Sequence, residues 1–193
     1  MKRKTVMVFA LSLLASAVFA AEGSEAVRNG KFTETGAPPK NAKGVVGTQW
    51  AKNWNCAGAA ELKEGKIHLS SGVIYQLLSL PGDGRQYLLK AEIKASAMQG
   101  KQGVLNARMS SCIRQNPNTP FSHAIQKKFG PFKLGDAVRS YQFEFKIEPY
   151  EQGYLYLGES NAVIESVSVM MEPAGTCGNS AKSAGSRSRP WWS

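Results

Sequence analysis

Strict alternation of apolar and polar residues is the main pattern in the middle of the chain. In residues 141–147, Tyr, Phe, Phe and Ile occupy every second position, with Gln, Glu and Lys between them. The same alternation runs through residues 87–95 and 105–110. Because successive side chains of a strand point to opposite faces of a sheet, each segment is predicted to be a strand with one buried and one wet side.

Shorter apolar segments, separated by turn residues, predict the other strands. They cover residues 27–33, 47–54, 66–70, 73–80, 124–129, 154–158 and 162–171. The sequence Pro-Gly-Asp-Gly at 81–84 predicts a turn, because Pro fixes φ and Gly allows positive φ. No segment of helical period is long enough to predict a helix. The pattern therefore predicts an all-β sandwich or barrel between about residues 27 and 171.

The two ends of the chain differ from this middle part. Three positive charges in residues 1–4, an uncharged apolar run over 6–19 and Val-Phe-Ala at 18–20 predict a secretory signal peptide, residues 1–20. A membrane anchor is the alternative, but the run is shorter than a bilayer span, so no stable membrane insertion is expected. Residues 172–193 are polar and basic and predict a flexible tail. The protein is therefore expected to be secreted, either to the periplasm or to the exterior.

Charge narrows the class of partner. The chain carries 24 Lys and Arg against 14 Asp and Glu, a net charge of +10. Removing the three charges of the signal peptide leaves +7, and the tail holds another three at Lys182, Arg187 and Arg189. The remaining excess, about four charges, is too small and too dispersed to predict a nucleic-acid surface. Solubility explains it, although attraction to acidic glycans or to a negative cell surface stays open.

Three cysteines enter an oxidising compartment if the chain is secreted. Cys56 and Cys112 lie in the strand-rich region and Cys177 lies in the tail, so a disulfide between Cys56 and Cys112 is the preferred pairing. A cysteine nucleophile is less favoured, because neither His68 nor His123 forms a local motif with a cysteine.

Several motifs, in order, carry a resemblance to a known family. They are Val-Arg-Asn-Gly-Lys-Phe at 27–32, Ile-Tyr-Gln at 74–76 before Pro-Gly, the strand at 141–145, and Ile-Glu-Ser-Val at 164–167. Together they resemble the bacterial carbohydrate-binding modules of the galactose-binding-like type, which include cellulose- and xylan-binding modules. The resemblance covers about residues 26–171 and implies a β-sandwich jelly roll that binds a polysaccharide or a surface glycan.

The resemblance also bears on metal binding. Relatives use acidic residues in the opening and closing motifs to hold a structural calcium, which takes several oxygen ligands. Here Thr33 follows the phenylalanine and Glu34 comes one residue later, while Glu165 stands at the usual aspartate position. If calcium is retained, Glu34 and Glu165 are its expected ligands, and no other cofactor is expected.

Sugar recognition uses flat aromatic faces together with a few polar groups for hydroxyls. The aromatic candidates are Trp50, Trp54, Tyr75, Tyr154 and Tyr156. The polar candidates are Gln76, Asn106, Arg108 and Gln142. Each has a structural alternative: an aromatic residue can belong to the core, a polar residue can be merely solvated, and Gln76 can be a buried amide that organises loops.

No constellation of catalytic residues is visible. Glu144, Glu148 and Glu151 are not spaced so that two of them would face each other across a glycoside, and neither zinc-site spacing nor a nucleophile elbow is present. The leading hypothesis is a secreted, non-catalytic carbohydrate-binding protein. The alternative is a secreted protein-interaction or surface-associated module on the same sandwich, with the tail as its docking segment.

Overall fold

The computed structural model describes residues 23–40, 42–113 and 125–174, and these form strands and turns without a helix. The prediction of an all-β fold is confirmed. The predicted signal peptide, Cys177 and all but three residues of the predicted tail lie outside this part. The strands are β1 (Ser24–Glu25), β2 (Thr35–Gly36), β3 (Lys43–Val46), β4 (Trp50–Ala51), β5 (Asn55–Lys63), β6 (Lys66–Leu77), β7 (Tyr87–Ala97), β8 (Gly103–Ile113), β9 (Ile125–Leu134), β10 (Arg139–Ile147) and β11 (Glu151–Pro173). Within the described residues there is accordingly no helix that could cross a membrane.

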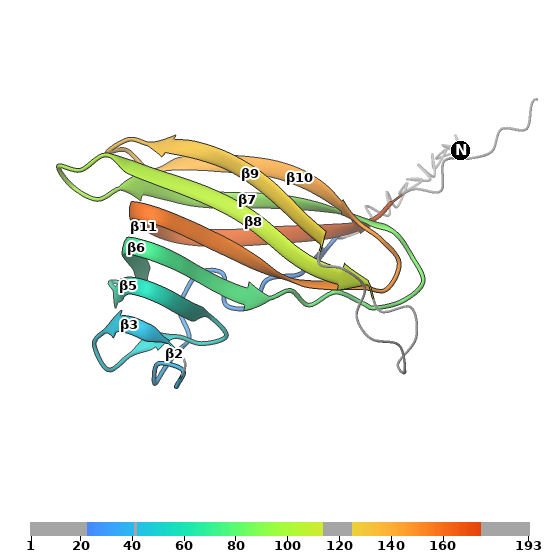
Figure 1. Cartoon of the computed structure of the whole chain (residues 1–193), viewed down its shortest axis with the longest axis horizontal. Coiled ribbons are helices and arrows are strands. Elements are labelled where there is room, and N and C mark those ends of the chain that lie inside the picture. Colours follow the sequence, from blue (N-terminus) through green and yellow to red (C-terminus); the bar gives the residue numbers. More distant parts are fainter. Residues whose placement is uncertain (1–22, 41, 114–124, 175–193) are drawn as a thin grey trace, which may run out of the picture.

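Strand β11 belongs to both layers of the molecule. Its first part, residues 151–160, lies between β8 and β6, whereas residues 162–173 pair with β7. One layer therefore runs β9-β8-β11-β6-β5-β3, and the other joins β10, β7, the end of β11 and β1 (Figure 1). All these pairs are antiparallel except β3 with β5. The backbone of β11 is irregular where it changes partners, with a positive φ of 51° at Asn161.

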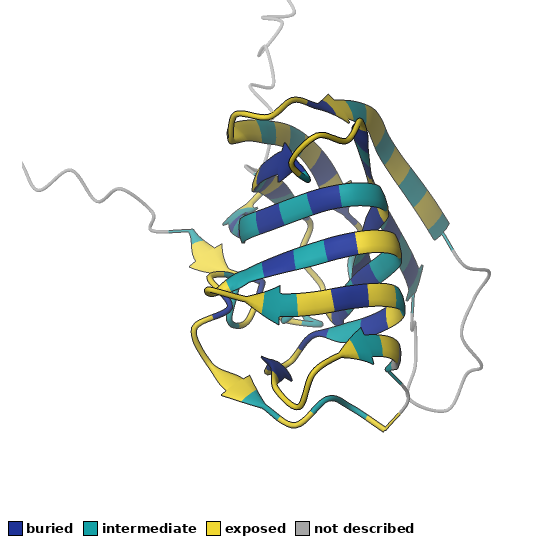
Figure 2. Cartoon of the chain, turned by 90° about the vertical axis from the view of Figure 1, so that its left-hand side faces the viewer, coloured by how far each residue is buried: buried dark blue, intermediate teal, exposed yellow. Residues whose placement is uncertain are grey.

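The predicted alternation places the core between the layers. In β7 the residues at 87, 89, 91, 93 and 95 are buried, as are Leu105, Ala107 and Met109 of β8. Exposed and buried bands alternate along the strands accordingly (Figure 2). Burying these apolar side chains is the main stabilising contribution, at about 25 cal/mol for each Å² of apolar surface.

Strand boundaries differ from the predictions where pairing overrides local sequence. The segments predicted as separate strands at 66–70 and 73–80 form the single β6, and those at 154–158 and 162–171 form β11. Strand β5 was missed because Asn-Cys-Ala-Gly-Ala-Ala has little β propensity; it is held by β6 on one side and β3 on the other. Residues 27–33 do not form a strand, since Asn29 and Phe32 have positive φ values of 51° and 55°.

Trp50 and Trp54 belong to the core, and this corrects their expected exposure as ligand platforms. Each side chain is only 1% exposed. The indole N–H of Trp50 donates to the backbone oxygen of Trp54 at 2.9 Å, and that of Trp54 donates to the backbone oxygen of Asn29 at 3.2 Å. The Trp54 ring also meets Phe32 edge to face, with centroids 5.5 Å apart. Both indoles are therefore enclosed and fully bonded.

The predicted disulfide between Cys56 and Cys112 is wrong for this structure, where both thiols are free. Cys56 lies on β5 and Cys112 on β8, with β6 and β11 between those strands. Neighbouring strands are about 4.8 Å apart, so three spacings exceed the roughly 7 Å limit for bridged Cα atoms. Burial raises the pKa of the Cys56 thiol to about 11.

Candidate functional site

A row of side chains crosses the outer face of the β9-β8-β11-β6-β5 layer. The strand register places Lys128 of β9 opposite Arg108 of β8, Arg108 opposite Tyr156 of β11, Tyr156 opposite Tyr75 of β6, and Tyr75 opposite Asn55 of β5. Their chain neighbours, such as Ala107, Leu155, Leu157 and Ile74, are buried in the core, so the row itself faces outward. We call these five residues the cross-strand row.

Three members of the row are stacked. The Arg108 guanidinium lies 4.6 Å from the centroid of the Tyr156 ring. On its other side, Tyr156 stacks on Tyr75 with centroids 5.1 Å apart and an angle of 21°. Such cation–π and aromatic contacts restrict the side chains to defined orientations. The row consequently presents ring edges, hydroxyl groups and a guanidinium rather than the faces of these two rings.

Tyr154 lies on the same face of β11, two residues before Tyr156 of the row. It is the most exposed of Tyr75, Tyr154 and Tyr156. It is 39% exposed, and its ring is inclined to those of Tyr75 and Tyr156 by 66° and 49°. Its cross-strand neighbour is Leu77, which is 52% exposed. Tyr154 and Leu77 therefore form an open apolar surface beside the stacked row.

A groove of about 710 Å³ runs along the other side of the row. Two glycines line it where neighbouring strands approach closely: a Cβ at Gly72 would lie 2.2 Å from a backbone oxygen of β5, and one at Gly158 would lie 2.1 Å from the oxygen of Gly72. Arg108, Lys128, Tyr156 and Val73 are among the residues that line it. The Asn106 amide donates to the Glu159 carboxylate within the groove.

A second, smaller cavity of about 390 Å³ lies at the end of the strands beside Tyr154. Its lining is rich in amides. Besides Tyr154, the polar residues that line it are Arg28, Asn53, Asn55, Gln76, Ser79 and Gln152. Because Tyr154 and Asn55 also belong to the outer face, this cavity continues the surface formed by the tyrosines.

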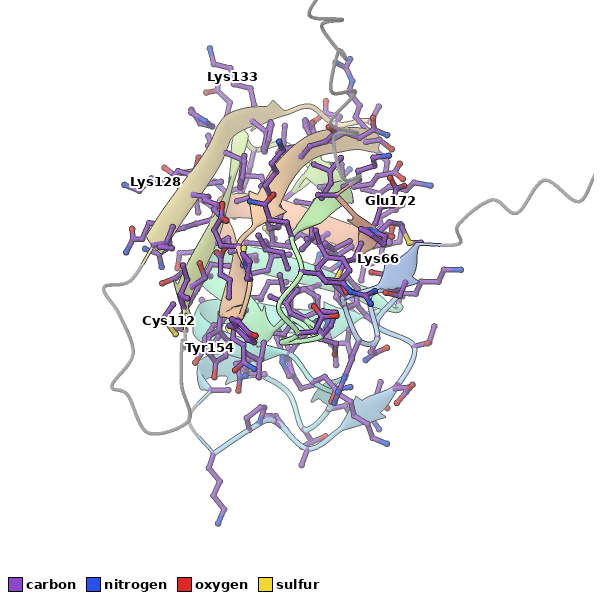
Figure 3. All side chains as sticks on the ribbon, turned by 90° about the vertical axis from the view of Figure 1, so that its right-hand side faces the viewer. Lys66, Cys112, Lys128, Lys133, Tyr154 and Glu172 are labelled. Carbon is purple, nitrogen blue, oxygen red and sulfur yellow. The ribbon has the colours of Figure 1, made fainter. Side chains whose placement is uncertain are left out.

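The structure brings together five of the candidates chosen from the sequence. They are Tyr75, Asn106, Arg108, Tyr154 and Tyr156. Figure 3 shows Tyr154 below Lys128 and Lys133, which extend from β9.

Gln142 and Gln76 lie elsewhere. Gln142 is on β10, in the other layer, opposite Glu92 of β7. Gln76 is 1% exposed and both accepts from and donates to the backbone of Arg28, at 2.9 and 3.1 Å. It follows the alternative considered above, a buried amide that organises a loop.

The residues expected to hold calcium do not fit that ion. The Glu165 carboxylate accepts a hydrogen bond from the Lys66 ammonium, and the backbone oxygen of Glu34 accepts from the Asn29 amide at 2.8 Å. Nowhere in the described residues do three potential ligands among His, Cys, Asp and Glu gather. Calcium needs about six to eight oxygen ligands, so no part of the site is assigned to a metal.

Sequence reasoning missed Lys128, Asn55, Glu159 and the two glycines. Alternation in residues 125–129 carries a signal for Lys128, because Gln126 and Lys128 alternate with less exposed residues. For Asn55 and the glycines no local signal exists, since their place depends on strands β6 and β11.

Comparisons with known proteins return structures only. No family model matches the chain, and no curated protein matches it. Among solved structures, a CBM4 module is 12% identical, with 75% of this chain and 99% of that chain covered and a TM-score of 0.42. A protein from Bacteroides thetaiotaomicron described as a sugar-binding protein is 14% identical, with 80% and 96% covered and a TM-score of 0.36.

A third match is the enzymatically active domain of tailspike protein 4 from bacteriophage CBA120. It is 11% identical, with 77% of this chain covered and a TM-score of 0.43. The chain spans about a fifth of that domain, since only 21% of it is covered. All three TM-scores lie below 0.5, so these matches carry no argument about this chain.

Proposed function

We propose that this protein is a non-catalytic carbohydrate-binding module that holds a polysaccharide or surface glycan on the outer face around Tyr154 and the cross-strand row. The observation that carries the proposal is the Tyr154 ring: it is 39% exposed, stands at an angle to its aromatic neighbours, and lines an amide-rich cavity. A sugar ring has one apolar face, which stacks on such a ring, and hydroxyls at its rim.

Polar groups suited to those hydroxyls surround the ring. Within the described part of the chain, the hydroxyls of Tyr75, Tyr154 and Tyr156 have no hydrogen-bond partner in the protein. A tyrosine hydroxyl both donates and accepts, as do sugar hydroxyls. Bound sugar would therefore satisfy groups that otherwise bond only to water.

Export from the cytoplasm and the absence of catalysis belong to the same proposal. Export rests on the charged and apolar pattern of residues 1–20. It is tested by sequencing the amino terminus of the protein recovered outside the cytoplasm, with a start near Ala21 expected. Recovery of the full-length chain in the cytoplasm would overturn this part.

The binding test is a pull-down and an affinity-electrophoresis series with soluble and insoluble polysaccharides. Tyr154→Ala is expected to weaken retention by at least tenfold, because it removes the exposed ring. Tyr150→Ala is the matched control, since Tyr150 is 45% exposed but lies in the turn between β10 and β11. Equal loss in both variants, or retention that survives Tyr154→Ala, would contradict the proposed surface.

A further inference from the structure

Arg108 and Lys128 form a pair of like charges directly opposite each other on neighbouring strands. Such pairs destabilise a sheet, because the two charges repel and nothing in the ladder separates them. Both side chains line the groove. Arg108 and Lys128 lie on the same outer face as the tyrosines, so the two charges and the tyrosine rings belong to one surface.

Neither cation has an acidic partner within the described part of the chain. Over the residues that the structure describes, the ion pairs join Lys66 with Glu165, Arg85 with Asp83, Lys90 with Glu172 and Lys127 with Glu151. The one carboxylate among the groove residues, Glu159, is bonded by the Asn106 amide. The groove therefore keeps a local excess of positive charge.

Stacking holds Arg108 in a fixed place. Its guanidinium carbon lies 4.6 Å from the Tyr156 ring centroid, and no protein acceptor among the described residues takes its N–H groups. A guanidinium donates two parallel hydrogen bonds to a carboxylate, which an ammonium cannot match in geometry. Lys128 adds a second charge one strand away, about 5 Å along the row.

We propose that this groove selects polysaccharides that carry carboxylate groups, with Arg108 and Lys128 binding the carboxylate while Tyr154 holds a sugar ring. The inference rests on the proposed function and adds the chemical class of the ligand. A polysaccharide of uronic acids supplies both parts along one chain: one sugar ring stacks on Tyr154, and the carboxylate of a neighbouring sugar binds in the groove that Arg108 and Lys128 line.

The test uses three uronic-acid polysaccharides, polygalacturonate, alginate and hyaluronan, each beside its methyl-esterified form. Esterification keeps the backbone and removes the charge. At least one acidic form is expected to bind about tenfold or more tightly than its ester, since a hydrogen bond to a charged group contributes more than a neutral one. Binding should also weaken between 0.05 and 0.5 M salt, as screening shortens the Debye length from more than about 10 Å to less than about 8 Å.

Three variants separate position from net charge. Arg108→Gln and Lys128→Gln should each remove most of the preference for the acidic form, whereas Lys94→Gln, on an exposed position of β7, changes net charge equally and should leave it. Lys128→Glu should raise the melting temperature by pairing with Arg108, while it abolishes acidic binding. A higher melting temperature together with lost binding of the acidic form would exclude a purely structural role for Lys128.

The outcomes distinguish the two proposals. If acid and ester bind alike and Tyr154→Ala abolishes both, the module is carbohydrate-binding but the carboxylate inference is overturned. Stronger retention of dextran sulfate than of every uronic acid, unchanged by Arg108→Lys, would also overturn it, because charge without geometry would then suffice. Loss of binding to the acidic form in Lys94→Gln would overturn the inference as well, because net charge rather than position would then matter. Failure of every polysaccharide, neutral or acidic, would overturn both.

Discussion

Replacing Trp54 with alanine tests whether the tryptophans stabilise the fold or bind ligand. The Trp54 side chain is 1% exposed and meets Phe32 edge to face at 5.5 Å. Its indole N–H bonds the backbone oxygen of Asn29 at 3.2 Å, in the turn that leads away from β1. The substitution therefore removes a buried ring and one of the two hydrogen bonds that the Asn29 oxygen accepts, the other coming from the Phe32 backbone N–H at 3.1 Å.

The expected loss in free energy of unfolding is large. Truncating a buried tryptophan to alanine costs about 3–5 kcal/mol through lost transfer energy and the cavity that remains. The lost hydrogen bond to the Asn29 oxygen, which keeps its bond from the Phe32 N–H, adds about 1 kcal/mol. A domain of this size has a total stability of about 5–15 kcal/mol, so Trp54→Ala should lose a large part of it. Trp54→Phe keeps most of the apolar ring and should lose only about 1–2 kcal/mol, mainly for the hydrogen bond.

The assay is urea unfolding followed by circular dichroism, with polysaccharide binding measured on the same samples. Trp54→Phe should bind as the parent does, because it remains folded and its outer face is unchanged. Tyr154→Ala should show the reverse, with stability within about 1 kcal/mol of the parent and binding lost. The reasoning is refuted if Trp54→Ala unfolds with nearly the parental free energy and yet loses binding, since the indole would then be exposed to ligand.

Three further predictions concern the thiols, a buried ion pair and the groove. Burial raises the pKa of the Cys56 thiol from 9.0 to about 11. At pH 8 we therefore expect Cys112 to be alkylated first and Cys56 only on unfolding, as measured by peptide mass spectrometry. Equal alkylation rates of the two thiols would contradict this. Because the folded state keeps the Cys56 proton where the unfolded chain loses it, its contribution to stability is full below pH 9 and is lost as the pH rises through 11. Lys127→Met should lower the free energy of unfolding in urea by about 3 kcal/mol, because the carboxylate of Glu151 has no exposed surface and Lys127 bonds both of its oxygens, at 2.9 and 3.1 Å. Adding Glu151→Gln should restore part of this loss, and no recovery in the double variant would count against the ion pair. Gly72→Ala should lower the melting temperature by several degrees and weaken polysaccharide binding, because its Cβ would lie 2.2 Å from a backbone oxygen at a φ of 97°.

Local patterns in the sequence determined how side chains divide between the two faces of the alternating strands. The period of two follows from the geometry of a single strand, so the outward direction of Asn106 and Arg108 could be predicted without knowing what lies beside them. For Tyr154 and Tyr156 the alternation predicted a shared face of β11 but not which face is wet, since Leu155 and Leu157 could equally have been the outward pair; the structure buries the two leucines. The all-β fold follows from the same alternation repeated along the chain.

Tertiary structure alone decided which strands lie side by side. Lys128 stands opposite Arg108, and Tyr75 opposite Tyr156, because pairing joins segments that are 20 to 81 residues apart in the chain. Burial of Trp54 is equally non-local: an aromatic residue in a short strand becomes core or surface according to what covers it, here Phe32 and the turn at Asn29. The sequence therefore determined the two faces of each strand, through backbone geometry, whereas long-range pairing and packing determined which of those faces meet to form a site.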